Sequence, residues 1–132
     1  MKSLLLFVAL LCAVTFSSSS LPVSNASTAG QKQKAVTQFN QPVRLRGVVL
    51  KGEYLFVHDD AAMMRGEACT YVYKGNAEVA DKLVVSFRCL PALRAKAAHF
   101  TVRTVEVSPG VWEVREFQFG GDSEAHFVPP AT

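Results

Sequence analysis

Two segments near the C-terminus, residues 99–107 and 111–119, alternate apolar and polar side chains on either side of a Ser-Pro-Gly sequence at 108–110. Alternation with a period of two residues is typical of a β-strand that buries one face. Pro followed by Gly suits the central positions of a type II turn. The pattern predicts an antiparallel hairpin in which Val102 pairs with Phe117.

The register of this hairpin produces two charge pairs. Arg103 faces Glu116, and opposite charges on paired strands attract each other. Glu106 faces Glu113, and like charges in that position are destabilising. The second pair counts against the register near the turn.

The rest of the chain continues the pattern of short strands and Gly or Pro turns. Further strands are expected at residues 43–49, 54–58, 69–74, 82–89 and 125–128. Lys51-Gly52 is the expected turn between the first two, and brief helical segments are expected at 61–65 and near 92–98. We therefore expect an all-β fold: a small antiparallel barrel or sandwich of about six strands built from consecutive hairpins, with one or two short helical turns.

The start of the chain has the composition of a secretory signal peptide. Lys2 precedes an apolar run from Leu4 to Phe16, and small residues follow it. That run is too short to span a hydrocarbon core of about 30 Å. We expect a signal peptide and cleavage region over residues 1–29, with cleavage between 20 and 29, and an exported protein, secreted or periplasmic.

Removal of the signal leaves a flexible lead-in at 30–41, rich in polar residues, and a single β-domain at 42–132. A short edge strand at 35–39 is an alternative within the lead-in. The loss of Lys2 leaves 13 basic against 11 acidic side chains, a net charge of +2. The basic residues are scattered rather than clustered, which argues against a nucleic-acid partner. No later apolar run is long enough for a membrane span, so no integral membrane segment is expected after signal removal.

Two cysteines, Cys69 and Cys89, remain after the signal is lost. In an exported protein such a pair points to a disulfide. A hairpin that places Cys69 opposite Cys89 also places Tyr71 opposite Phe87, and cross-strand aromatic pairs favour that register. The competing interpretation is a pair of metal-binding thiolates.

The connection that ends at Cys69 reads HDDAAMMRGEAC and begins at His58. In a structural interpretation Asp60 caps a helix at 61–65 and Gly66 ends it in the left-handed conformation. Met63 and Met64 would then fill one end of the core. As a functional loop, its chemistry lies in His58, Asp59, Asp60, Arg65 and Glu67.

The same connection contains possible metal ligands. Thioethers and imidazoles suit Cu(I), so a copper site would use His58, Met63 and Met64, with His99 or His126 as a further ligand. Calcium binding through Asp59, Asp60 and Glu67 is a second possibility, although their spacing is not that of an EF-hand. His126 is expected at the surface.

Three functions remain open. The sequence contains no G-x-S-x-G or H-E-x-x-H motif, which favours a non-enzymatic binding or structural module that requires no cofactor. Its partner would be an unknown protein, a glycan or a small ligand. The alternatives are an extracytoplasmic copper- or other metal-binding protein, and a small hydrolase with a cleft that joins His58 to a carboxylate and a hydroxyl.

Overall fold

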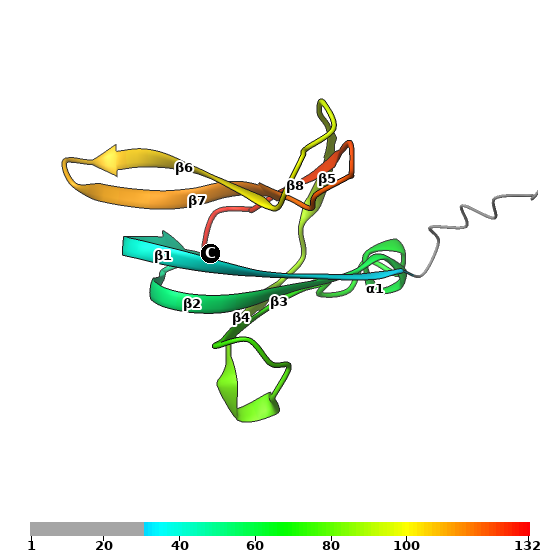
Figure 1. The fold of residues 1–132 in the computed structure, drawn as a ribbon, viewed down its shortest axis with the longest axis horizontal. Helices are drawn as coiled ribbons and strands as arrows, with labels where there is room; N and C mark the ends of the chain where they lie inside the picture. Colours follow the sequence, from blue (N-terminus) through cyan, green and yellow to red (C-terminus); the bar gives the residue numbers. More distant parts are fainter. Residues whose placement is uncertain (1–30) are drawn as a thin grey trace, which may run out of the picture.

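A computed structural model describes residues 31–132, so the expected signal peptide lies outside the described part of the chain. The described residues form an all-β domain, as expected (Figure 1). The strands are β1 Lys32–Leu45, β2 Val48–Asp59, β3 Thr70–Lys74, β4 Leu83–Phe87, β5 Leu90–Leu93, β6 Thr101–Ser108, β7 Val111–Gln118 and β8 Glu124–Phe127. A short helix α1 covers Asp60–Met64, and a 3₁₀ turn η1 covers Ala80–Lys82. Within residues 31–132, no helix is long and apolar enough to cross a membrane.

All eight strands belong to one curled sheet, with more strands than the six expected. Its order is β4-β3-β2-β1-β7-β8-β5, and β6 pairs with β7. The first four strands form one half and the β6–β7 hairpin lies over it, so that the sheet makes a half-barrel (Figure 1). The two halves join through a short parallel pairing of β1 with β7 at Val43 and Arg44. The core lies between them, where the rings of Phe56 and Phe117 are 5.5 Å apart.

The β6–β7 hairpin has the predicted register in the part that lies farthest from its turn. Val102 pairs with Phe117, and Arg103 pairs with Glu116. The expected contact between Glu106 and Glu113 is wrong, because a bulge after Arg103 shifts the register by one residue. The bulge places Trp112 opposite Glu106, which separates the two like charges along the ladder.

The first hairpin turns earlier than the sequence indicates. Arg46 and Gly47, with φ of 48° and 83°, form the turn, and positive φ at both positions is the geometry of a type I′ hairpin. Gly52, expected in the turn, lies inside β2 opposite Phe39. The flexible lead-in at 30–41 is also wrong for residues 32–41, because β1 already pairs with β2 from Lys32 onward.

Two expectations are wrong for the β3–β4 hairpin and the segment that follows it. Tyr71 pairs with Ser86 rather than Phe87, so the β3–β4 register differs from the expected one by a single residue. The segment near 92–98 does not begin with a helix, because β5 pairs there with β8. Pro91 is acceptable in β5 because this strand lies at the end of the sheet order, where a missing N–H breaks no second ladder.

Candidate metal centre

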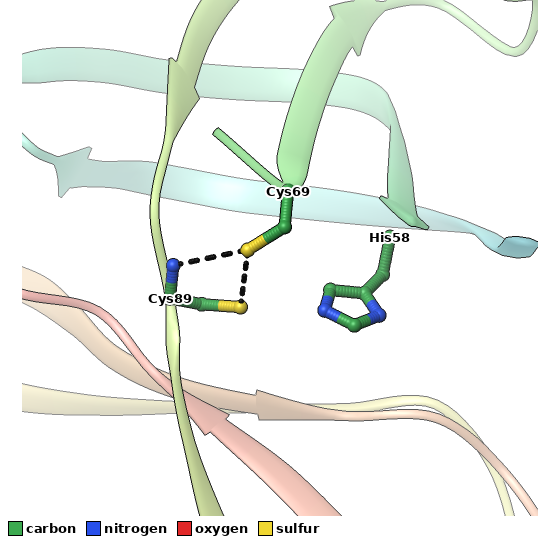
Figure 2. Close-up of side chains that lie close together, drawn as sticks. All are labelled: His58, Cys69 and Cys89. Atoms are coloured by element: carbon green, nitrogen blue, oxygen red, sulfur yellow. Dashed lines mark hydrogen bonds between the residues drawn. The ribbon is translucent and has the colours of Figure 1, made fainter. Parts of the chain in front are cut away.

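Three side chains that can bind a metal meet inside the domain. His58 comes from the end of β2, Cys69 directly precedes β3, and Cys89 lies between β4 and β5. One ligand atom of each lies within 4.8 Å of the other two, and all three residues are buried. Figure 2 shows the His58 ring beside the two sulfur atoms.

Sheet pairing brings these residues together. His58 lies opposite Thr70 in the β2–β3 ladder, and the Asp59 N–H donates to the Cys69 carbonyl at 2.8 Å. The Cys69 N–H donates in turn to the Phe87 carbonyl at 3.1 Å, which fixes Cys69 beside the end of β4. The site is therefore held by backbone hydrogen bonds between neighbouring strands, a rigid support for ligands.

The two cysteines are adjacent free thiols. Their sulfur atoms lie 2.9 Å apart, and the Cys89 N–H donates to the Cys69 sulfur at 3.2 Å (Figure 2). A hydrogen bond from the Cys89 thiol lowers the pKa of Cys69, and the same hydrogen bond raises the pKa of Cys89. Cys69 is thus the thiol of the pair that ionises first, and the thiolate is the form that binds a metal.

His126, on β8, borders the cluster through its contacts with His58 and Cys89. The expectation that it lies at the surface is wrong, because the side chain is fully buried. Its ring lies against that of His58, with the centroids 4.0 Å apart and the planes tilted by 35°, and its Nδ1 lies 3.7 Å from the Cys89 sulfur. Burial, and then the neighbouring His58, lower the pKa of His126 to about 4, so its ring is neutral at neutral pH.

A sequence signal for His126 did exist. Strand residues two apart share a face, so His126 shares a face with Val128. Val128 is buried and Phe127, between them, is 40% exposed. An apolar residue such as Phe127 is normally expected on the buried face and a histidine on the exposed face. Here the two are reversed, so the sequence pattern was difficult to recognise.

The cluster contains several polar atoms without partners. Among the described residues, the buried side-chain nitrogens and oxygens that lack a hydrogen bond are Nδ1 and Nε2 of His58, Nε2 of His126 and Oγ1 of Thr70. His58 Nδ1 lies 3.0 Å from Oδ1 of Asp60, but without hydrogen-bond geometry. A buried polar atom normally has a partner, and leaving one unpaired costs about 1–3 kcal/mol. A ligand bound by the histidine nitrogens would remove that cost.

The residues of the predicted functional loop divide between the interior and the surface. Asp59 rather than Asp60 caps α1, because its carboxylate accepts from the Ala62 N–H at 3.1 Å. Gly66 has the expected left-handed conformation, with φ of 75°. Arg65 and Glu67 form an exposed ion pair with each other.

The two methionines of α1 differ in their exposure to solvent. Met63 is partly buried and packs against the core, whereas the side chain of Met64 is 74% exposed. The expectation that both fill the core is therefore right only for Met63. His99 is exposed. A copper site built from His58, Met63 and Met64 remains a prediction. The structure gathers His58 with two cysteines for which a disulfide was expected and metal-binding thiolates were the competing interpretation.

Comparison with known proteins adds no assignment. No known protein family matches the sequence, and neither curated proteins nor solved structures provide a match.

Proposed function

We propose that this protein is an exported, non-enzymatic β-domain that binds a soft metal ion, Cu(I) or Zn²⁺, through Cys69, Cys89 and His58. The observation that supports it most is the convergence of two thiols and a buried imidazole within 4.8 Å. Thiolate sulfur and imidazole nitrogen are the ligands that Cu(I) and Zn²⁺ prefer. Hard ions such as Ca²⁺ require oxygen ligands instead.

His126 completes the proposed site. Its Nδ1, 3.7 Å from the Cys89 sulfur, is at the separation of two ligands that share one ion, about 3.6 Å for tetrahedral zinc. The sulfurs, 2.9 Å apart, would have to separate to about 3.8 Å, which a small side-chain rotation achieves. The neutral state of His126 leaves a nitrogen lone pair free for the metal.

A hydrolase receives less support from this arrangement. His58 is close to a carboxylate, that of Asp60, and pairs across the sheet with a hydroxyl residue, Thr70. However, His58 and Thr70 are both fully buried. A general base has to reach the proton that it removes from a substrate. Burial of this depth suits a bound ion better than a dissolved substrate.

The test is metal titration of the exported protein, purified under reducing conditions without oxygen. We expect it to bind a single Zn²⁺ or Cu(I) per chain, and the Cys69→Ser and Cys89→Ser variants to lose at least about a hundredfold in affinity. His99→Gln is the matched control, because His99 is exposed and outside the cluster. Equal affinity in the control and in the cysteine variants would refute the proposal.

A second candidate is a structural module closed by a Cys69–Cys89 disulfide. The burial of both sulfurs and their distance of 2.9 Å support it, since a bond of about 2.0 Å needs a shift of less than 1 Å. A disulfide closing this loop would stabilise the fold by roughly 3 kcal/mol in the chain-entropy model. One molecule cannot use the same sulfurs for both purposes, so a count of free thiols separates the two candidates.

A further inference from the structure

A cavity of about 320 Å³ lies beside the buried cluster. Its lining residues are Gln31, Gln33, Asp60, Met63, Met64, Asp122 and Glu124. The cavity therefore combines three carboxylates with two thioethers, and no basic side chain within residues 31–132 lines it. This composition attracts cations and repels anionic ligands.

Asp60 connects the cavity to the cluster. Its carboxylate lines the cavity, and its Oδ1 lies 3.0 Å from Nδ1 of the buried His58. That nitrogen has no hydrogen-bond partner and no solvent exposure. Asp60 is thus a single side chain with the open cavity on one side and the buried His58 ring on the other.

The cavity keeps negative charge. Burial alone would raise the pKa of Asp122, but hydrogen bonds from the Glu124 N–H at 3.0 Å and from Gln33 Nε2 at 3.1 Å lower it overall. Asp122 is therefore ionised at neutral pH. Its position beside Asp60 also contributes to the raised pKa of the Asp60 carboxyl, for which burial is the main cause.

We propose that this cavity is the port through which Cu(I) reaches the buried cluster. The inference rests on the proposed metal-binding function and selects Cu(I) over Zn²⁺ as the ion. Thioethers bind Cu(I) and have little affinity for Zn²⁺, so the exposed Met64 captures the ion, together with the partly buried Met63 that also lines the cavity. Asp60 then moves aside and His58 and the two cysteine sulfurs replace the thioethers. The copper remains Cu(I) throughout, no electron is transferred, and the protons that the two free thiols carry pass to water as their sulfurs bind as thiolates.

The experiment follows the rate of metal uptake by the reduced, exported protein. Cu(I) is supplied as a complex with a chromogenic chelator, and Zn²⁺ is supplied separately. In the Met63→Leu, Met64→Leu double variant, which preserves side-chain volume, we expect several-fold slower Cu(I) uptake, unchanged final occupancy and unchanged Zn²⁺ uptake. Asp60→Asn should slow the uptake of both ions by about tenfold, because it removes charge at the port. Asp81→Asn, an exposed acid outside the cavity, is the control and should have no effect.

The outcomes separate the port from the site. Equal Cu(I) rates in wild type and in the methionine variant would overturn the port and leave the metal site standing. Uptake of Zn²⁺ but not of Cu(I) by the wild type would overturn the assignment of copper. No uptake of either ion by the wild type would overturn both the port and the proposed function. A parallel fall in Zn²⁺ and Cu(I) uptake in the methionine variant would indicate a structural effect and overturn the capture role.

Discussion

The imidazole rings of His58 and His126 lie in contact, with their centroids 4.0 Å apart and their planes tilted by 35°, and neither ring is exposed to solvent. Two protonated rings at this distance would repel each other strongly in a buried site. The lowered pKa of His126 follows from burial and from this neighbour. The contact therefore depends on a neutral His126, which also makes the ring available as a ligand.

The first prediction concerns the stability of the metal-free, reduced protein at acidic pH. His126 has a pKa of about 4 in the folded chain and 6.5 as its ordinary value. Between these values the unfolded chain binds a proton that the folded chain does not, so folding stability rises with pH. The contribution of the neutral His126 to the free energy of unfolding is complete above about pH 6.5. It is lost as the pH falls to about 4, and the loss has an upper limit of about 3 kcal/mol. Urea unfolding at a series of pH values measures it.

His126→Gln is the control for this pH dependence. The raised pKa values of Asp60 and Glu124 act in the opposite sense, because those carboxyls bind protons more readily in the folded chain. Both carboxyls remain in the variant, so the difference between the two profiles isolates the histidine. Identical slopes in wild type and variant would show that His126 is not a buried neutral ring.

Gly66 gives the second prediction. Its φ of 75° is unfavourable for any residue with a Cβ, although an added Cβ would meet only the Arg88 guanidinium at 3.7 Å. Gly66→Ala should therefore destabilise the protein by about 1 kcal/mol through backbone strain alone. Gly66→Asn should cost less, since Asn tolerates the left-handed region better. Thermal unfolding of both variants tests this, and equal melting temperatures for Gly66→Ala and wild type would contradict the strain.

Glu116 gives the third prediction. Its carboxylate is buried and forms ion pairs with Arg103 of β6 and with Arg94, 2.8 Å away. Glu116→Gln should cost about 1–3 kcal/mol, less than a fully buried pair, because both arginines are partly exposed and regain water. Glu113→Gln is the matched control on the same strand, where the ion pair with Arg115 is more exposed and should contribute less than about 1 kcal/mol. Chemical denaturation measures the free energy of unfolding of both variants, and a similar loss in the two would contradict this prediction.

The two methionines give the fourth prediction. Met63→Ala should cost about 1–2 kcal/mol, because the side chain is partly buried against the core and its removal loses contacts there. Met64→Ala should be close to neutral, because that side chain is 74% exposed. Chemical denaturation compares them directly. A larger loss for Met64 than for Met63 would mean that α1 lies in a different orientation.

The part of the β6–β7 hairpin that lies farthest from its turn could be predicted because its signals are local. Strict alternation and the turn at 108–110 place Val102 opposite Phe117, as observed. The first hairpin could not be placed in the same way. Its turn requires a positive φ at Arg46, a residue with no preference for that conformation, whereas Gly52 is a strong turn signal that the strand simply accommodates.

The segment at 32–41 was misread for a different physical reason. Between Lys32 and Phe39, β1 pairs with β2 on one edge, and the pairing of β1 with β7 is confined to Val43 and Arg44. An edge strand keeps many polar side chains in solvent, and its composition then resembles that of a flexible segment. Pro42 lies at the register shift in β1, where it disrupts no regular pair.

The candidate site was predictable in its parts but not in its assembly. The sequence singled out His58, Cys69 and Cys89 separately, the first as a possible ligand and the others as a disulfide. Their convergence depends on the pairing of β2 with β3 and of β3 with β4. The register of the β3–β4 pair differs by one residue from the expected one. His126 joins them through long-range pairing of β8 with β5 and β7, which no local pattern specifies.

The central claim is that Cys69 and Cys89 hold a metal ion as thiolates. The most direct test counts metal and free thiols together in protein purified after export, without added reductant. We expect a single bound Cu(I) or Zn²⁺ per chain, and both thiols should become titratable when the protein is unfolded with a chelator. A protein that contains neither metal nor titratable thiol would contradict the claim and establish the disulfide instead.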